Sequence, residues 1–174
     1  ASLRPHPFRP AGHLSWLERL ADEAEQGRRT PPDTRAFIAA ARSLAPMRDA
    51  VRALPAHRAV THRDLTPSNL LLDPQGTVWG IDFENDREDE PLRDLVSLGL
   101  ARIAEGADAP DSIMRALATG YATDLMPDAA MVFVQKALAL GVWGRTPERP
   151  SKRQAALMHA ARWLLDQDRA LFQP

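Results

Sequence analysis

A proline-containing loop and the β-hairpin that follows it constrain the fold of this chain more than any other feature. Pro67 has no amide hydrogen and a fixed φ angle, so no regular helix can run from Asp64 to Asn69. Short apolar and β-branched runs then flank the tight-turn sequence Asp73-Pro-Gln-Gly76. The sequence therefore predicts a compact loop and, directly behind it, a hairpin over residues 70–83.

Most of the remaining chain shows the three- and four-residue apolar spacing of amphipathic helices. Three prolines among the first ten residues predict an extended lead-in, and Asp33 is placed to cap the second helix. The predicted helices cover residues 15–26, 33–46, 47–54, 92–105, 111–126, 128–143 and 152–171. We therefore expect an α+β fold that is mostly helical and contains one small β-hairpin.

The composition limits the classes of function. The chain has 174 residues, a formal net charge of −1 and no cysteine. A near-neutral charge gives no bulk attraction to nucleic acid, and arginines scattered through the later helices (Arg145, Arg149, Arg153 and Arg162) form no recognition motif. The lack of cysteine fits a reducing compartment, and no apolar run approaches the roughly 20 residues of a membrane span. We expect a cytoplasmic protein with neither a nucleic-acid nor a membrane partner.

Three oxygen-bearing side chains are predicted to converge around the loop and hairpin. Asp64 and Asn69 lie five residues apart on the loop, and the pairing of the hairpin strands brings Asp82 back beside Asn69. An amide oxygen and a carboxylate form an incomplete set of hard ligands, which suits Mg²⁺ that also binds phosphates and water. Asp64 would remain free to act as a base.

The spacing of these residues resembles that of a known enzyme family. The pattern His62-x-Asp64-Leu-x-Pro-x-Asn69, followed by Ile-Asp82-Phe and by Asp94-Leu, is similar to the aminoglycoside phosphotransferase and choline kinase-like family. His62-Arg63-Asp64 also looks like the catalytic loop of protein kinases, but no Ala-Pro-Glu element follows the Asp-Phe pair. The resemblance, which runs from residue 60 to 98, therefore favours a small-molecule kinase.

The resemblance implies a role for each matching residue. Asp64 would accept the proton of the substrate hydroxyl, while Asn69 and Asp82 would hold Mg²⁺ against the phosphates of ATP or another nucleoside triphosphate. His62 would order the loop, and Asp94 would either organise that loop or cap the helix that begins near residue 92. Arg63 stands where this family often has glycine.

The resemblance also implies the C-terminal lobe of a protein-kinase-like fold. Residues 12–174 would form this lobe, with the catalytic loop and metal segment at 60–98, and residues 1–11 would be the former hinge region. Only 63 residues precede Asp64, and they contain no lysine and no phosphate-binding glycine loop. We therefore expect the N-terminal nucleotide-binding lobe to be absent, and a start at Ala1 fits an excised or truncated piece of a longer kinase.

Two functions remain open at this stage. The first is an ATP- and Mg²⁺-dependent phosphotransferase of small-molecule hydroxyls; the second is a catalytically silent binding or scaffold module derived from that lobe. Seven acids between Asp82 and Asp94 would favour a cationic substrate, unless they form only a solvated acidic turn. A missing lobe would leave an exposed apolar face, through which we expect self-association.

Overall fold

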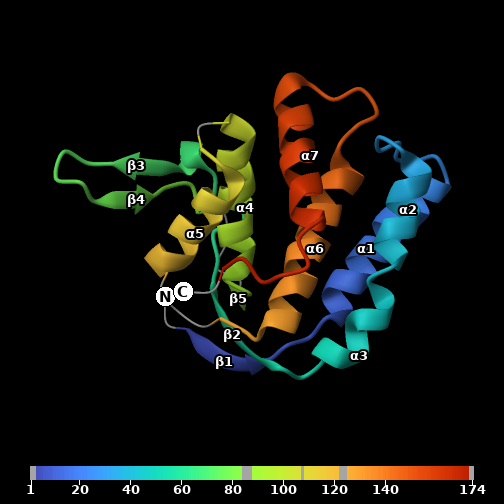
Figure 1. Cartoon of the computed structure of the whole chain (residues 1–174), viewed down its shortest axis with the longest axis horizontal. Helices are drawn as coiled ribbons and strands as arrows, with labels where there is room; N and C mark the ends of the chain where they lie inside the picture. Colours follow the sequence, from blue (N-terminus) through green and yellow to red (C-terminus); the bar gives the residue numbers. More distant parts are fainter. Residues whose placement is uncertain (1–2, 84–87, 107, 122–124, 173–174) are drawn as a thin grey trace.

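The computed structural model is built mainly from helices, with two small antiparallel sheets (Figure 1). It describes residues 3–83, 88–106, 108–121 and 125–172. The α-helices are α1 (Ala11–Glu25), α2 (Thr34–Arg42), α3 (Arg48–Val51), α4 (Leu92–Glu105), α5 (Pro110–Tyr121), α6 (Asp128–Arg145) and α7 (Lys152–Leu165). Short 3₁₀ turns, η1 (Ala45–Met47) and η2 (Pro67–Asn69), precede α3 and the hairpin. The prediction of an α+β, mostly helical fold is confirmed.

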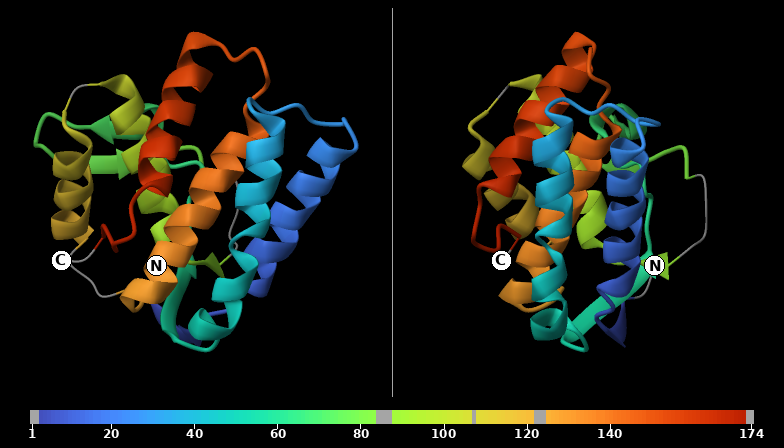
Figure 2. Two further views of the ribbon diagram at one scale, coloured as in Figure 1. Left: turned by 45° about the vertical axis from the view of Figure 1, so that its right-hand side comes forward. Right: turned by 90° about the vertical axis from the view of Figure 1, so that its right-hand side faces the viewer.

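The helices pack around α6, whose side chains are buried on nearly every side. Helices α1 and α2 lie against α6 from one direction, and α7 and α4 lie against it from another (Figure 2). A helix that is apolar all round is stable only when it is enclosed in this way. Within the described ranges, no helix combines the length and the apolarity needed to cross a membrane.

A three-stranded sheet, which the sequence did not predict, leads into the loop that carries Asp64 and Asn69. Strand β2 (Pro55–Val60) pairs antiparallel with β1 (Arg4–Pro7) on one side and with β5 (Glu88–Asp89) on the other. The prolines of β1 are tolerated because β1 is an edge strand. The sheet fixes the end of β2, where Thr61 and His62 begin the loop.

The predicted hairpin consists of β3 (Leu70–Leu72) and β4 (Val78–Gly80), which pair antiparallel. Figure 1 shows it projecting away from the helices, and its large apolar side chains Leu71, Leu72, Val78 and Trp79 are exposed. The indole Nε1 of Trp79 donates to Asp73 at 3.0 Å, so the turn residue also orients the exposed ring. Self-association through such a face stays a prediction.

Several local predictions about helix ends were wrong. The first helix begins at Ala11 and not at residue 15, and the second ends at Arg42 and not at residue 46. Asp33 adopts a left-handed conformation with φ of 53° and makes no side-chain hydrogen bond to cap α2. The last helix ends at Leu165 instead of residue 171, because the buried side chain of Gln135 holds the chain beyond it. Gln135 accepts from the amide of Leu171 at 2.9 Å and donates to the carbonyl of Arg169 at 3.1 Å.

We predict that Gly141→Ala destabilises the fold. The ring of Trp16 lies so close to Gly141 that an added Cβ would overlap it, and overpacking of this kind costs about 1–3 kcal/mol. Gly120→Ala in α5 is the matched control, because nothing lies within 4 Å of the added Cβ. Urea unfolding should show a lower free energy for Gly141→Ala and an unchanged or higher one for Gly120→Ala. Equal stabilities would contradict the close packing of α1 on α6.

We also predict that Glu90 contributes to the stability of the fold and that this contribution is lost in acid. His13 Nε2 lies 3.5 Å from Oε2 of Glu90, and Arg58 Nη2 lies 3.5 Å from Oε1. Burial would raise the pKa of Glu90, but the hydrogen bonds and charges of its neighbours hold it well below the ordinary value of 4.5. The stabilisation is therefore present above pH 4.5 and is lost as the pH falls below it.

Unfolding of the wild type and of Glu90→Gln at several pH values checks this contribution. At neutral pH we expect the variant to be less stable by about 3 kcal/mol, since breaking a buried ion pair leaves its partners uncompensated. The difference should shrink as the pH falls below 4.5. A constant difference across that range would refute the coupling of Glu90 to His13 and Arg58.

Candidate active site

The carboxylate of Asp94 holds the catalytic loop in place. Asp94 lies in the first turn of α4, and its two oxygens accept hydrogen bonds from the amides of His62 at 2.6 Å and Arg63 at 2.8 Å. Of the two roles considered from the sequence, organising the loop is the one that these bonds serve. Burial raises the pKa of Asp94, although the two amides act in the opposite direction.

His62 connects the loop to the segment that carries Asp82. The His62 ring is buried, and its Nε2 lies 2.6 Å from the carbonyl oxygen of Ile81, to which it donates. Its ring also contacts that of Phe83, with the centroids 4.5 Å apart. The amide of Ile81 in turn donates to the carbonyl of Asn69 at 3.0 Å. These contacts fix the backbone on which Asp82 stands, and they make His62 a positioning residue.

Two site residues adopt the left-handed backbone conformation. Arg63 has φ of 69° and Asp82 has φ of 63°, and each directly follows a residue that is anchored by hydrogen bonds. This conformation is unfavourable for a long side chain such as arginine and is free of cost for glycine. The glycine often found at this position in the resembled family would therefore fit without strain. Here the guanidinium of Arg63 gains an ion pair with Asp89 at 3.0 Å.

The loop also brings Asn69 against Asp64. The Nδ2 of Asn69 donates to the backbone carbonyl of Asp64 at 2.9 Å, which leaves the Oδ1 of Asn69 as an acceptor. The side chain of Asp64 is exposed, and no ion pair of Asp64 is found among the described residues. The three predicted residues are thus linked by backbone contacts: Asp64 to Asn69, and Asn69 to the residue before Asp82.

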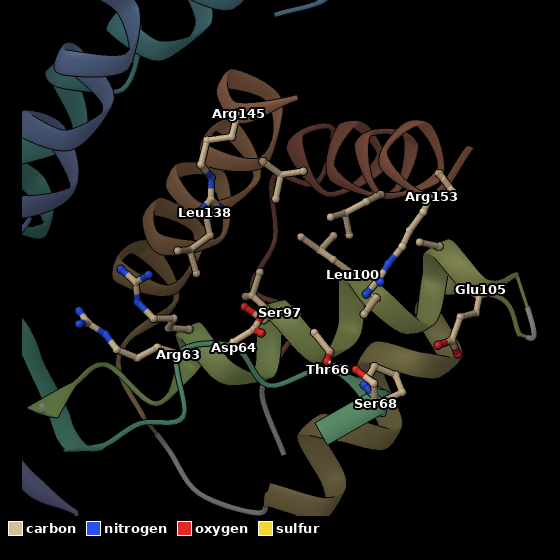
Figure 3. Close-up of a pocket in the computed structure, with 18 of the residues that line it drawn as sticks. Arg63, Asp64, Thr66, Ser68, Ser97, Leu100, Glu105, Leu138, Arg145 and Arg153 are labelled. Atoms are coloured by element: carbon tan, nitrogen blue, oxygen red, sulfur yellow. Dashed lines mark hydrogen bonds between the residues drawn. The ribbon is translucent and has the colours of Figure 1, made fainter. Parts of the chain in front are cut away.

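A cavity of about 480 Å³ lies beside Asp64, between the loop and helices α4, α6 and α7 (Figure 3). The loop contributes Arg63, Asp64, Thr66, Pro67 and Ser68. The helices contribute an apolar wall, with the side chains of Val96, Leu100, Leu138, Val142 and Leu157. Asn69 and Asp82 do not line the cavity. Asp64 is therefore the predicted site residue that faces this space, and the two predicted metal ligands lie outside it.

The sequence analysis missed the arginines of this cavity. Arg93 of α4, Arg145 of α6 and Arg153 just inside α7 line it together with Arg63. Arg145 and Arg153 were visible in the sequence only as members of a scattered set, because they lie on different helices. They line one cavity only because α6 and α7 pack together, and no local sequence pattern indicates that packing.

The acidic residues between Asp82 and Asp94 do not form one free negative surface. Glu88 pairs with Arg4 at 3.3 Å, and Asp89 pairs with both Arg63 and Arg93. Glu90 and Asp94 are held by the contacts given above. Glu84 and Asp86 lie outside the described residues. The observation that favoured a cationic substrate is therefore weakened, since Glu88, Asp89 and Glu90 are paired with cationic neighbours.

The oxygen donors beside the hairpin, those of Asn69 and Asp82, suit Mg²⁺ only at a site that a nucleotide completes. No group of three or more His, Cys, Asp or Glu that could hold a metal occurs in the part of the chain that is described. The amide oxygen of Asn69 and the carboxylate of Asp82 are hard donors and would leave positions for phosphate oxygens and water. The residues present fit a metal ion that arrives with a nucleotide.

Comparison with known proteins identifies the family of this chain. Residues 1–131 match the profile of the phosphotransferase enzyme family. The chain belongs to this family. The resemblance to aminoglycoside phosphotransferase-like enzymes is thereby confirmed. No curated protein matches the chain.

Among solved structures, two crystal forms of a glucosamine kinase are similar to this phosphotransferase-family chain. Each has 16% sequence identity and a TM-score of 0.39, and the match covers 93% of this chain. It covers 36% of the glucosamine kinase, so the chain spans about a third of the length of that protein.

We predict that Asp94→Asn weakens both the fold and the site. The substitution puts an amide donor against one of two backbone donors, and an unsatisfied group of this kind costs about 1–3 kcal/mol. Asp49→Asn, at an exposed residue of α3, is the control and should change the stability by less than about 0.5 kcal/mol. Urea unfolding measures the stability of both variants. If Asp94→Asn is as stable as the control, Asp94 does not hold the loop.

Proposed function

We propose that this chain is the catalytic lobe of an ATP- and Mg²⁺-dependent phosphotransferase that acts on a hydroxyl group of a small molecule. The observation that carries the proposal is the position of Asp64, which is fixed on a loop anchored by Asp94 and faces a cavity of small-molecule size. Membership in the phosphotransferase enzyme family supports the same reaction class.

In the proposed reaction, Asp64 accepts the proton of the substrate hydroxyl as that oxygen attacks the γ-phosphorus of ATP. The new O–P bond forms while the bond from the γ-phosphorus to the bridging oxygen breaks, and ADP leaves with its electron pair. Asp64 is suited to this role because its carboxylate is exposed to the cavity. A correctly placed general base contributes about 10²–10⁴ in rate.

Asn69 and Asp82 are the residues that would hold Mg²⁺, which would neutralise charge on the phosphates during transfer. His62 supports Asp82 through the carbonyl of Ile81. Asn69 supports Asp64 through its own hydrogen bond to the loop. The base and the metal ligands are therefore proposed to act as one unit in which each member positions another.

The alternative is a silent module that kept the lobe and lost the reaction. Such a module has no need for a base and two hard ligands to be held by buried contacts, and the anchoring of His62 and Asp94 therefore favours an active lobe. The two functions differ in one measurable property, which is Mg²⁺-dependent binding of nucleotide at Asp82.

We predict that the 174-residue chain binds ATP in the presence of Mg²⁺ and that Asp82→Asn lowers the affinity at least about tenfold, as the loss of a ligand interaction does at metal sites. Asp64→Asn should leave this affinity unchanged, because Asp64 acts on the acceptor. Asp49→Asn serves as the control for loss of one exposed carboxylate. Calorimetric titration measures all four proteins.

Either of two results would contradict the proposal. Binding that is insensitive to Mg²⁺ and to Asp82→Asn would exclude the metal site. Absence of Mg²⁺-dependent binding by the wild type would exclude a nucleotide site that is complete within these 174 residues. The titration would then be repeated with an N-terminal lobe added, and continued absence of binding would establish the silent module.

A further inference from the structure

The cavity beside Asp64 carries an excess of positive charge. Four arginines line it, against two carboxylates, those of Asp64 and Glu105. Glu105 is already paired with Arg102, which lies outside the lining. Arg63 and Arg93 both pair with Asp89. This one carboxylate offsets only one of their two charges. Arg145, Arg153 and Asp64 have no ion-pair partner among the described residues.

Arg145 is held with its guanidinium fork available. Its Nε donates to the carbonyl of Gly141 at 2.9 Å, and its guanidinium carbon lies 5.6 Å from the centre of the Trp16 ring. These contacts fix the plane of the group, while its two terminal nitrogens make no hydrogen bond to the residues that the structure describes. A planar fork with two parallel N–H donors matches a carboxylate or a phosphate.

The surroundings of Arg145 also favour an anion. Burial lowers the pKa of Arg145, and the charges of Arg93 and Arg29 lower it further, while Asp64 acts in the opposite direction. The group remains charged at neutral pH, but its charge is poorly compensated. A bound anion would supply the compensation that the described carboxylates do not.

Arg153 brings a second cation to the cavity from another helix. Figure 3 shows Arg145 and Arg153 reaching toward the cavity from different sides, from α6 and α7. Arg153 makes no ion pair with the described residues, and its side chain is exposed. Between the two arginines and the loop lies the apolar wall of the cavity, which suits a carbon skeleton rather than a second charged group.

We propose that the acceptor of the phosphotransferase is a small alcohol that also carries a carboxylate or a phosphate, with this anionic group bound by Arg145, with Arg153 adding positive charge to the cavity, and with its hydroxyl presented to Asp64. The inference rests on the proposed function, of which it names the substrate class. It replaces the cationic substrate considered from the sequence, because Glu88, Asp89 and Glu90 are paired with arginines and the cavity carries an excess of arginine.

Four sugars that share one pyranose ring test the proposal: glucose 6-phosphate, glucuronate, glucose and glucosamine. Calorimetric titration of the 174-residue chain should show binding of one or both anions at least about tenfold tighter than that of glucose or glucosamine. The two anionic arms distinguish a phosphate from a carboxylate as the recognised group.

Variants assign this binding to the cavity. Arg145→Gln and Arg153→Gln should each weaken binding of the anion about tenfold or more, and Arg115→Gln, an exposed arginine of α5 outside the cavity, should leave it unchanged. Arg153→Gln keeps the test valid if Arg145→Gln does not fold, because Arg153 makes no contact on which the described fold depends.

Several results would overturn the proposal. They are equal or tighter binding of glucosamine, no binding of either anion up to millimolar concentration, and an equal effect of Arg115→Gln. A loss of Mg²⁺·ATP affinity in the arginine variants as large as their loss of anion affinity would also overturn it, since the arginines would then serve the nucleotide. Discrimination among the sugars without any Mg²⁺·ATP binding, even with an N-terminal lobe added, would refute the proposed function and leave the anion site standing.

Discussion

The two hydrogen bonds from the loop amides to Asp94 are the interaction on which the site depends. Asp94 belongs to α4, which packs against α6 and α7 in the core. The loop is therefore tied to the most buried part of the fold. The ring of His62 also donates to the carbonyl of Ile81. The carboxylate of Asp94 therefore positions the two residues before Asp64 and, through His62, the residue before Asp82.

This arrangement separates two kinds of surface around Asp64. On one side lie the exposed hairpin and the hard donors Asn69 and Asp82, which suit a metal ion and phosphates. On the other side lies the arginine-lined cavity between α4, α6 and α7. Asp64 faces the cavity and is bonded through its backbone to Asn69, so it stands where two reactants would meet. Phosphoryl transfer requires such a meeting point because positioning and charge provide most of its catalysis.

The sequence predicted those elements whose signals are local. The helical stripes predicted α4 with both of its ends, and the tight turn at Asp73 predicted the hairpin. The sheet of β1, β2 and β5 was missed because its strands are short and contain proline and charged residues in place of an alternating apolar pattern. Asp33 has the residue type of a helix cap, but its backbone is left-handed and its side chain makes no capping hydrogen bond. Such conformations depend on tertiary contacts that a short window of sequence does not contain.

The sequence by itself determined the family of this chain, because the residue types and offsets of His62, Asp64, Asn69 and Asp82 form a local pattern that resembles that of a known phosphotransferase family. Only the tertiary structure decided what surrounds them. Asp94 becomes an anchor, and Arg145 and Arg153 become neighbours of Asp64, through the packing of three helices that are distant in the chain. The charge of a cavity is a sum over such distant residues. Composition near neutrality therefore hid a cationic pocket that folding brings together.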